Sequence, residues 1–481
     1  MKFSLSKVSI PHVFIFLSAI ILFSAILTYI VPSGEFDRKT RKVSHIEQTV
    51  IIPGSYQRLD KNFSIKGLIL GENIEGKASP TSLLGLFTSI PKGMNQSAAL
   101  IFFVFIIGAV FNLISHTGTI NVVMFNLLNR FRENPIILLF SIFIFVAAIN
   151  SFMGMGPMLI PLVVIFLLIS KEFGYDRVFG VALFLLPMSI GWTTAITNPF
   201  TVQIAQSIAE VPVGSGMGLR IILFIVCIAL GFIFLMRYGK KVKANKSFSI
   251  MKDDPFILSE EVKIEQQAIT KKHILILSMA GILFVMILYA VQTMGWGLIE
   301  MTGGFFTVGL LTILISGMSG DESMKAFVKG LEQMIIPALI VGFARGIQVV
   351  MQEGLIIDTM LFHTSNYLES LPKLLSVEGM FIFQVVMNFF IPSASGQALV
   401  SMPLMTPLSD LLGITRQTAV LAFILGDGFS NIVIPTNGVL MAILGIAGVP
   451  YENWIKFVMR FFLYMMLISF TVLAIAVLIS Y

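Results

Sequence analysis

The sequence predicts an all-α polytopic membrane protein whose two halves form an inverted repeat, each half with one re-entrant helical hairpin and one broken transmembrane helix. Composition supports this class, because 56% of the 481 residues are hydrophobic and only 12% are charged, about half the charged share of a soluble protein. Several apolar runs also approach the roughly 20 residues that a membrane-spanning helix needs. Finally, polar clusters interrupt the apolar runs at matching positions of the two halves.

These matching clusters carry most of the functional information. The first half contains residues 150–157 (NSFMGMGP) and 197–199 (TNP), and the second half contains 388–397 (NFFIPSASGQ) and 435–438 (PTNG). Four residues recur 239 positions later, Gly174, Arg177, Thr197 and Asn198 as Gly413, Arg416, Thr436 and Asn437. Polar breaks are costly in lipid unless they are buried in protein or line a cavity. A matched pair therefore predicts a substrate site at the centre of a secondary transporter.

The first repeat is expected over residues 1–238. Its first apolar run is too long for the core of a signal peptide, so we interpret it as a span. The polar segment 33–80 is interpreted as an extracellular loop, and alternation over residues 41–53 with the turn signal Pro53-Gly54 predicts a small β-hairpin there. The other predicted elements follow from apolar length and from the polar breaks: spans 12–31, 97–115 and 218–237, the hairpin 135–171 and the broken helix 177–210.

The hairpin prediction rests on length. The apolar arms 135–149 and 157–170 each have about 15 residues, or roughly 22 Å of helix, which is short of the ~30 Å hydrocarbon core. Charges at both outer ends, Arg132 and Lys171, suggest that the segment enters and leaves on one face. Residues 375–412 repeat this pattern and predict the second hairpin.

Basic residues set the expected orientation. They are concentrated in residues 237–272, so the linker 239–272 is expected in the cytoplasm, as is the N-terminus. The extra span 273–293 then starts the second repeat (273–481) on the outside, which inverts it and leaves the C-terminus outside. The other elements of this repeat are spans 297–316, 333–352 and 453–479, the hairpin 375–412 and the broken helix 415–449.

Candidate site residues lie mainly at the hairpin turns and helix breaks. Amide and hydroxyl oxygens with freed carbonyls suit Na⁺, and the N-termini of half-helices suit a carboxylate. The candidate Na⁺ ligands are Asn150, Ser151, Thr197 and Asn198 in one half and Ser395, Thr436 and Asn437 in the other. The candidate substrate-binding residues are these together with Gly154, Gly156, Arg345, Ser393, Gly396, Asp427 and Asn431. The structural alternative is that the glycines allow close packing and the polar residues cap helices.

Two charges interrupt apolar segments. Asp427 precedes the break of the second broken helix, and Arg345 lies in the middle of a span. An intramembrane charge is a functional candidate by default. Asp427 suits a cationic substrate group, Na⁺ or a proton, and Arg345 suits a carboxylate. The alternative is that the two neutralise each other as a buried ion pair or hold the fold. Trp192, beside the first break, is expected either to line the site or to pack.

Other function classes find little support. The sequence contains no Gly-x-x-x-x-Gly-Lys-Ser/Thr, His-Glu-x-x-His, Cys-x-x-Cys, Gly-x-Ser-x-Gly or Gly-x-Gly-x-x-Gly pattern, so neither ATP binding through a P-loop nor enzymatic activity is expected. The net charge of +6 is spread between spans, which argues against nucleic-acid binding. No cofactor is expected beyond a coupling ion, Na⁺ or H⁺.

Several stretches spread over the chain also point to a known family: residues 31–36 (VPSGEF), 50–56 (VIIPGSY), 342–346 (GFARG), 391–397 (IPSASGQ), 426–431 (GDGFSN) and 435–437 (PTN). Together they resemble the YfcC family of bacterial membrane proteins, within the ion transporter superfamily. The resemblance implies a scaffold domain, a mobile transport domain and often a homodimer. It also implies basic amino acid antiport, although some members carry C4-dicarboxylate carrier labels.

The resemblance bears on the coupling ion as well. Dicarboxylate/sodium symporters of this superfamily carry Ser-Asn-Thr triplets at the hairpin turns and helix breaks. Here the corresponding positions hold Asn150-Ser151, Thr197-Asn198, Ser393-Ala394-Ser395 and Thr436-Asn437. Because of this departure, Na⁺ and H⁺ both stay open as coupling ions.

We therefore expect a secondary transporter of the bacterial inner membrane that works by alternating access, with the hairpins and broken helices moving as an elevator. The expected substrate is a small organic ion with a carboxylate. An amino acid is favoured, a basic one because of Asp427, and a C4-dicarboxylate is the alternative. The expected partners are this substrate, the lipid bilayer and a second copy of the chain. The alternatives from other classes are a passive channel, which needs no matched hairpins, and a membrane receptor, which leaves the mid-membrane polar residues unexplained.

Overall fold

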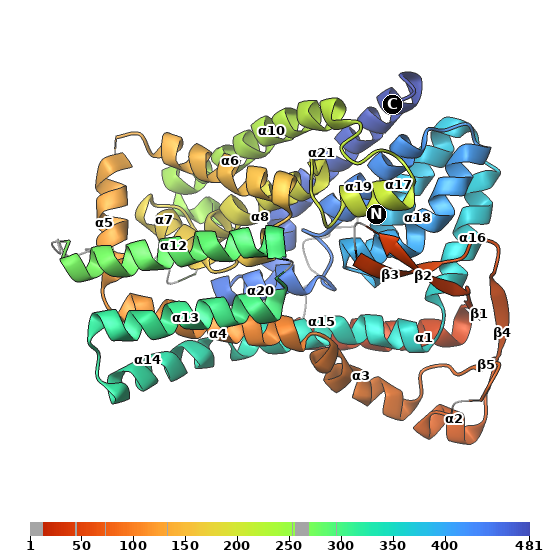
Figure 1. Cartoon of the computed structure of the whole chain (residues 1–481), viewed down its shortest axis with the longest axis horizontal. Coiled ribbons are helices and arrows are strands. Elements are labelled where there is room, and N and C mark those ends of the chain that lie inside the picture. The colour runs from red at the N-terminus through yellow and green to blue at the C-terminus, as the bar shows by residue number, and fades with distance from the viewer. Residues whose placement is uncertain are drawn as a thin grey trace.

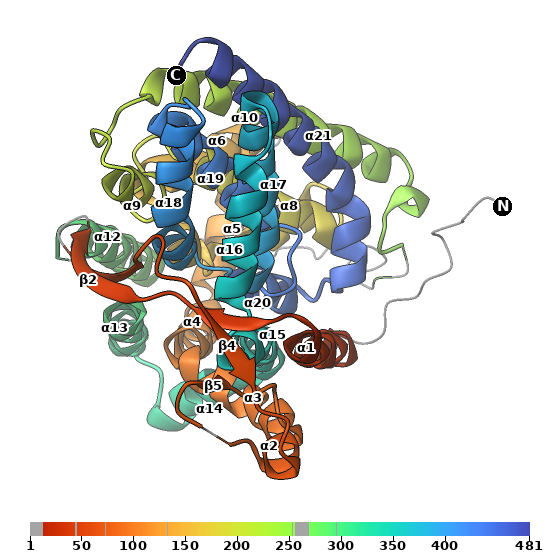
Figure 2. The same ribbon diagram turned by 90° about the vertical axis from the view of Figure 1, so that its right-hand side faces the viewer.

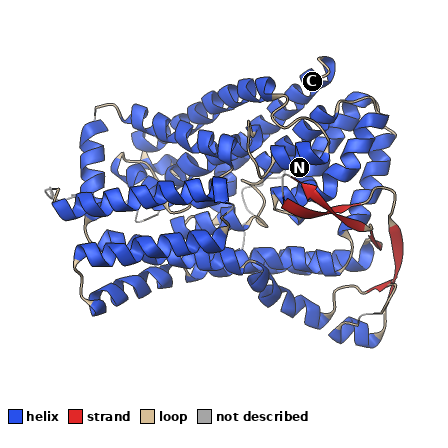
Figure 3. Ribbon diagram, in the orientation of Figure 1, coloured by secondary structure: helices blue, strands red, loops and turns tan. Residues whose placement is uncertain are grey.

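Helices dominate the structure, which is a computed structural model of the chain (Figure 3). It describes residues 13–481 except 44–45, 73, 132, 253, 255–268 and 295. Within these residues, eight helical segments are long and apolar enough to cross a membrane, which confirms the prediction of an all-α polytopic membrane protein. The predicted cytoplasmic N-terminus at residues 1–12 and the linker segment 255–268 lie outside the described residues.

Local signals set several helix boundaries in the first half. Ser82 begins one helix by accepting a hydrogen bond from Gly85 N at 2.9 Å, and Asp176 begins another by accepting one from Phe179 N at 2.8 Å. The elements are α1 (Val13–Ile30), β1 (Ser33–Glu35), β2 (Arg38–Val43), β3 (Ile46–Ile51), β4 (Gln57–Lys61), α2 (Ile65–Leu70), β5 (Lys77–Ala78), α3 (Leu83–Gln96), α4 (Ala98–His116), α5 (Thr119–Phe131), α6 (Pro135–Met153), η2 (Gly156–Leu159), α7 (Leu162–Glu172), α8 (Arg177–Thr194), α9 (Val202–Ile208), α10 (Met217–Ala244) and η3 (Lys246–Phe248).

The second half repeats the order of helices found from α3 to α10. Each half contains, in this order, an amphipathic helix, a span, a short helix, two hairpin helices, two helices separated by a break, and a long final helix. These elements, preceded by α12 and α13, are α12 (Lys271–Met294), α13 (Leu298–Ser316), α14 (Gly320–Gln333), α15 (Ile335–Glu353), α16 (Ile357–Glu369), α17 (Lys373–Phe390), α18 (Ala394–Leu411), α19 (Arg416–Ser430), α20 (Gly438–Ala447) and α21 (Tyr451–Leu478).

Three of the four hairpin helices are longer than the sequence analysis predicts, and α7 is shorter. α6 continues to Met153 rather than ending at 149, and α18 begins at Ala394 rather than 398. α6 and α17 are among the segments long enough to cross a membrane, whereas α7 has only 11 residues. The longer helices continue up to the residues that can cap them. The prediction that each hairpin arm is too short to cross the membrane therefore holds only for α7. The re-entrant course of both hairpins stays a prediction.

Other boundaries also differ from the prediction. α10 runs to Ala244, past the expected end at 237, because Lys241 and Lys243 in its last turn stabilise a helix C-terminus. α2 and α16 are helices that the sequence analysis did not predict. α2 has only six residues and α16 is only moderately apolar, so neither is recognised from the hydropathy pattern.

Two glycine contacts determine how the early helices of the two halves pack. Gly93 of α3 lies against α15, where an added Cβ would come within 2.5 Å of Gly342 O. Gly330 of α14 lies against α4, where an added Cβ would come within 2.5 Å of Gly108 O. These two contacts occupy equivalent places in the halves, so each half packs on the other in the same way. Small residues allow such close backbone approach between membrane helices.

The centre of the molecule is formed by α8 and α19. α19 is buried at every position from Gln417 to Ser430, and 83% of α8 is buried, compared with 28% of the most apolar window of α21. Figure 2 shows α6, α10, α17, α18 and α21 arranged around this central pair. Because α8 and α19 both end in a break, the breaks lie in the interior of the protein.

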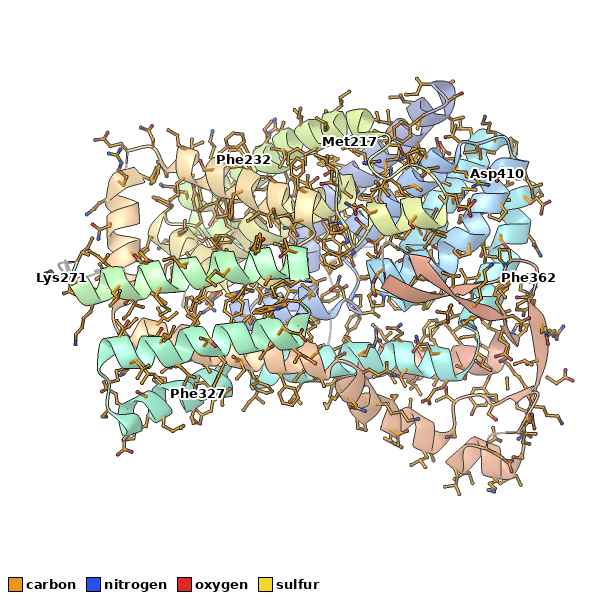
Figure 4. The ribbon with its side chains drawn as sticks, in the orientation of Figure 1. Met217, Phe232, Lys271, Phe327, Phe362 and Asp410 are labelled. Carbon is orange, nitrogen blue, oxygen red and sulfur yellow. The ribbon has the colours of Figure 1, made fainter. Side chains whose placement is uncertain are left out.

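The β-strands form a small cap at one end of the long axis (Figure 1). β2 and β3 pair antiparallel, so a β-hairpin is present as expected, but the turn signal Pro53-Gly54 follows β3 and does not join the paired strands. β1, β4 and β5 form a second sheet. Arg38 Nη2 contacts the buried Asp358 Oδ2 at 2.8 Å, and Tyr56 stacks on Phe362 with ring centroids 4.2 Å apart. These contacts fix the cap to α16. Figure 4 shows Phe362 beside the strands and Lys271 at the opposite end of the molecule.

Candidate substrate site

The first hairpin turn is built around Gly154. Its φ of 68° is left-handed and ends α6, and its N–H donates to Asn150 O at 3.0 Å. A Cβ at this position would collide with Asn198 Oδ1, so glycine lets the Asn198 side chain pack on the turn. Asn198 Nδ2 also donates to Asn150 O at 3.0 Å. The hairpin turn and the break of the next helix are therefore tied together.

Ser151 strengthens this connection. Its Oγ accepts a hydrogen bond from Ile196 N at 3.1 Å, and its carbonyl accepts one from Thr197 N at 3.1 Å. Thr197 Oγ1 donates to Phe152 O at 3.0 Å. Ala195, where α8 ends, has a left-handed φ of 38°, which costs roughly 1–3 kcal/mol for a residue with a Cβ and is typical of functional segments. The structure thus brings together the four polar residues predicted in the first half.

The second hairpin turn is shorter than expected. Ser393 is the N-cap of α18, and its Oγ accepts a hydrogen bond from Gly396 N at 3.4 Å. Ser395 and Gly396, which the sequence analysis places at the turn, therefore lie in the first turn of α18. A capping serine next to Pro392 starts the helix earlier than apolar length indicates.

Asn437 organises the second helix break. Its Oδ1 accepts hydrogen bonds from Val439 N at 2.9 Å and Leu440 N at 3.1 Å, which caps α20. Its Nδ2 donates to Asn431 Oδ1, and Asn431 Nδ2 donates to Asp427 O at 2.7 Å. The break is therefore spanned by a chain of side-chain amides from the end of α19 to the start of α20.

Asn388 is a site residue that the sequence analysis missed, although it lies in the quoted cluster. It stands near the end of α17 as Asn150 stands near the end of α6, and its Nδ2 donates to Asp427 O at 2.9 Å and Ser430 Oγ at 2.7 Å. The Oδ1 atoms of Asn150 and Asn388 and the Oγ1 of Thr436 are buried and accept no hydrogen bond from any described residue. Such oxygens are suited to a bound cation.

A cavity of about 340 Å³ lies between the turns and breaks, a size typical of small-molecule sites. Five of the predicted residues line it: Gly154, Ser393, Ser395, Asn431 and Asn437. Trp192 also lines the cavity, which is one of the two expectations stated for it. Lining residues that were not predicted include Met188 and Ser189 of α8 and the segment 296–298 between α12 and α13. Their approach to the turns is a matter of helix packing, for which no local sequence signal exists.

The remaining predicted residues lie outside the cavity wall. Several of them support the cavity wall through the hydrogen bonds described above. The predicted residues that do not line the cavity are Asn150, Ser151, Gly156, Thr197, Asn198, Arg345, Gly396, Asp427 and Thr436. Asp427 is fully buried, and its Oδ2 accepts a hydrogen bond from Trp192 Nε1 at 3.1 Å. Its Oδ1 has no hydrogen-bond partner among the described residues. Trp192 therefore separates this carboxylate from the cavity.

Arg345 does not pair with Asp427 in the described part of the chain. Its Nε donates to Gln96 Oε1 at 3.1 Å, and its Nη1 donates to Gln348. It thus belongs to the contact between α15 and α3. An ion pair between Arg345 and Asp427 is absent from the described residues, so that form of the predicted alternative is wrong, whereas the hydrogen bonds to Gln96 and Gln348 fit its other form, a role in holding the fold.

Helix ends dominate the electrostatics of the cavity. α18 and α20 begin at its wall with the neutral caps Ser393 and Asn437, and α13 also begins there, at Gly297, whose N–H is already bound by Glu300. The described lining residues include no Asp, Glu, Lys or Arg. Because a helix N-terminus carries about half a positive charge, the ends of α18 and α20 favour an anionic group.

Two arginines in register join the halves, one at the start of each broken helix. Arg177 Nη1 donates to Ala447 O at 3.0 Å, at the end of α20. Arg416 Nη1 donates to Ala209 O at 3.1 Å, at the end of α9, and Arg416 also binds Asp410 at 2.7 Å. Each broken helix therefore begins with an arginine that binds the end of the other broken helix.

We expect Arg416→Gln to destabilise the protein by about 1–2 kcal/mol, because it removes surface ion pairs and a favourable charge at a helix C-terminus. The melting temperature of the purified protein in detergent measures this. Arg130→Gln is the matched control, since Arg130 is an exposed arginine at the end of α5. Equal melting of both variants would contradict the assigned role of Arg416.

Comparison with known proteins identifies the family. The model of the DcuC family, described as the C4-dicarboxylate anaerobic carrier, matches residues 10–478. The chain belongs to this family. It is also 32% identical over 467 residues to a protein of Escherichia coli (strain K12) named "Putative basic amino acid antiporter YfcC", with 93% of this chain and 92% of the relative covered. The resemblance to the YfcC family is thereby confirmed.

Other similar proteins extend over nearly the whole chain too. A protein of Haemophilus influenzae described as uncharacterized is 26% identical over 496 residues, covering 93% of each chain. Among solved structures, the YdaH transporter of Alcanivorax borkumensis aligns over 98% of this chain and 99% of its own, with 14% identity and a TM-score of 0.42. MtrF of Neisseria gonorrhoeae, described with antimetabolite efflux pumps, aligns over 98% and 96%, with 13% identity and a TM-score of 0.41.

Proposed function

We propose that this protein is a secondary active transporter that works by alternating access at the cavity between its halves. The observation that carries the proposal is that Gly154 of the first hairpin turn, Ser393 of the second and Asn437 of the second break line the same cavity. A site between two equivalent halves can open to either side when one unit moves against the other. A single pore needs no such pairing.

An inverted repeat in the bacterial inner membrane is part of this proposal. In Figure 1, α5 and the start of α6 lie at one end of the long axis, and α16 and the start of α17 lie at the other. This supports a first hairpin open to the cytoplasm and a second open to the outside, with a cytoplasmic N-terminus and an external C-terminus. The segments α6–α9 and α17–α20 would move together as an elevator, within a homodimer.

The proposed substrate is a small amino acid with a basic side chain. Its carboxylate would bind at the N-termini of α18 and α20, where Ser393 and Asn437 face the cavity. Its cationic group would reach Asp427 once the Trp192 ring moves, because the buried Oδ1 of this carboxylate lacks a partner among the described residues. An isolated buried carboxylate is costly unless a cation or a proton neutralises it. The name of the Escherichia coli relative is consistent with this choice.

A C4-dicarboxylate is the second candidate. Two helix N-termini at one cavity match two carboxylates, and the described lining residues include no acidic side chain that would repel them. The description of the family model favours this substrate. Asp427 would then act only as a proton site.

The coupling ion is proposed to be Na⁺ or H⁺. For Na⁺, the buried and unpartnered oxygens of Asn150, Asn388 and Thr436 offer ligands at equivalent places of the two halves, and the carbonyls freed at the breaks would add to them. For H⁺, Asp427 is the carboxylate that could hold a proton.

Liposomes containing the purified protein test the proposal. They are loaded with arginine, ornithine or succinate and assayed for counterflow of the same labelled compound, with and without Na⁺. We expect saturable exchange and accumulation of a labelled basic amino acid against its gradient. Flux that never exceeds equilibration would instead indicate a passive channel, and the absence of flux for every compound would contradict a transporter of these substrates.

Ser393→Asp tests the carboxylate site. Aspartate caps a helix as well as serine does, so α18 should stay folded, but the added charge would repel a substrate carboxylate. We expect the affinity for substrate to fall by on the order of 10- to 100-fold, equivalent to about 1.4–3 kcal/mol. Counterflow at several substrate concentrations measures the change.

Ser319→Asp is the matched control for this variant. Ser319 caps α14 by accepting a hydrogen bond from Glu322 N at 3.2 Å, and it is not among the residues that line the cavity. Its substitution should leave transport unchanged. Equal effects of the two variants, or none from Ser393→Asp, would exclude the start of α18 as the carboxylate site.

A further inference from the structure

A second cavity lies between α10 and α21, away from the proposed substrate site. Its volume is about 780 Å³. It is lined by residues 230–241 of α10 and 456–468 of α21, and the segment after α10 contributes Phe248 and Ile250. Figure 1 shows the two helices side by side.

The floor of this groove is aromatic. The Phe234 ring lies 5.3 Å from Phe457 and 5.5 Å from Phe461, between ring centroids. Tyr238 packs on Phe457 at 4.8 Å, and its hydroxyl is directed to Asp176 rather than into the groove. These pairs also show that the helices run antiparallel, since higher numbers in α10 meet lower numbers in α21.

Charge is confined to one end of the groove. Four cationic side chains line that end, Arg237, Lys241, Lys456 and Arg460. The other end is lined by exposed apolar side chains such as Leu230, Ile233 and Leu467, which are 43%, 46% and 66% exposed. The groove is therefore amphipathic along its length.

Most of the positive charge at this end is not neutralised by the part of the chain that the structure describes. Lys456 pairs with Glu452, whereas Arg237, Lys241 and Arg460 form no ion pair with any described residue. All four cations are exposed. Like charges gathered at the rim of an apolar groove repel one another unless an anion binds between them.

The dimensions of the groove match one leaflet of a bilayer. From residue 456 to 468 of α21, a helix rises roughly 18 Å, and half of a ~30 Å hydrocarbon core is about 15 Å. The cationic end adjoins the basic segment after α10, where positive charge favours the cytoplasmic face. An acyl chain along the groove would thus place its headgroup at the cations.

We propose that the groove between α10 and α21 binds an anionic phospholipid of the cytoplasmic leaflet. Its phosphate lies among Arg237, Lys241 and Arg460, and one acyl chain lies over Phe234 and Phe461. Basic pockets between membrane helices recognise anionic headgroups through this combination of charge and depth. The lipid would join α10 to α21, the final helices of the two halves.

Thermal unfolding with defined lipids tests this proposal. The purified full chain is melted in detergent supplemented with dioleoylphosphatidylglycerol or with dioleoylphosphatidylcholine, and bound lipid is counted by native mass spectrometry. We expect phosphatidylglycerol alone to raise the melting temperature and to stay bound. Equal effects of the two lipids would overturn the proposal, and so would equal protection by free glycerol phosphate, which would indicate a soluble anion site.

Variants locate the effect. Each basic residue near an anionic headgroup contributes about 1 kcal/mol to binding. The double variant Arg237→Gln with Arg460→Gln removes two such residues and should weaken phosphatidylglycerol binding about 30-fold. Lys240→Gln with Lys329→Gln is the control, because both are exposed lysines that do not line the groove, and it should bind normally. Leu467→Trp, which fills the apolar end, should weaken binding without changing charge. Normal binding by both groove variants would overturn the proposal.

A second copy of the chain is the competing occupant. Tyr464→Cys distinguishes it, since the natural Cys227 is buried and the new thiol at this exposed groove position would be the reactive one. We expect no disulfide between chains in phosphatidylglycerol vesicles. An efficient crosslink would show that another protein chain, rather than lipid, covers the groove.

Discussion

Asp427→Asn is expected to abolish exchange of basic amino acids while leaving the protein folded. Asparagine has the shape of aspartate and keeps an acceptor for Trp192 Nε1, so packing in α19 should survive. It removes the negative charge that the proposed cationic group would meet in a buried setting. Losing one partner of such a pair costs roughly 2–5 kcal/mol, so kcat/KM for arginine or ornithine should fall by on the order of 100-fold or more.

The same variant separates the two substrate candidates. If the substrate is a C4-dicarboxylate, Asp427→Asn should retain exchange of succinate and lose only its dependence on a proton gradient. Asp410→Asn is the control for the loss of one carboxylate outside the cavity, because Asp410 lies at the exposed end of α18, at the surface in Figure 4. It breaks the ion pair with Arg416, so it should lower the melting temperature slightly and leave exchange unchanged. Retained uptake of arginine or ornithine by Asp427→Asn would exclude Asp427 as the partner of a cationic substrate.

Gly93→Ala and Gly330→Ala are expected to disrupt the packing of the early helices, and to do so equally. A Cβ added at Gly93 would meet Gly342 O at 2.5 Å and Gly346 N at 2.6 Å. These are backbone atoms, which cannot move aside as a flexible side chain can. The helices must separate, at a cost of about 1–3 kcal/mol or more for each overpacked contact. We expect a clear fall in melting temperature and a lower yield of monodisperse protein in detergent.

Gly303→Ala is the matched control, because Gly303 lies on α13 with no atom within 4 Å of an added Cβ. Alanine there should leave stability unchanged or raise it slightly, as alanine is the better helix former. If only one of Gly93→Ala and Gly330→Ala destabilises the protein, the two contacts are not equivalent and the proposed repeat loses its packing support.

Much of the site was predictable because its chemistry is local. Gly154 was identifiable as a turn residue, since a left-handed φ favours glycine. Asn437 was identifiable as a polar break just before an apolar helix, which needs a cap. The recurrence of Thr197 and Asn198 as Thr436 and Asn437 showed that the pattern occurs in both halves. Asn388 was missed although its place in the second cluster gave the signal.

Other parts of the site depend on which helices touch, and no sequence pattern specifies that. Arg345 was expected at the site because it is a charge in mid-span, but its partners come from α3 and from its own helix. The segment 296–298 forms part of the cavity wall only because α13 begins there. α6, α17 and α18 are longer than expected because their ends are set by caps rather than by apolar length.

Apolar length and the two matched sets of polar breaks already identify a membrane protein from the sequence, because apolar length, glycine conformation and capping act over a few neighbouring residues. That Trp192 lines the cavity and hydrogen-bonds the buried Asp427 behind it, and that the starts of α18 and α20 face the same space, emerges only in the folded chain. These facts depend on the packing of helices far apart in the chain, which small residues such as Gly93 and Gly330 permit but do not by themselves reveal.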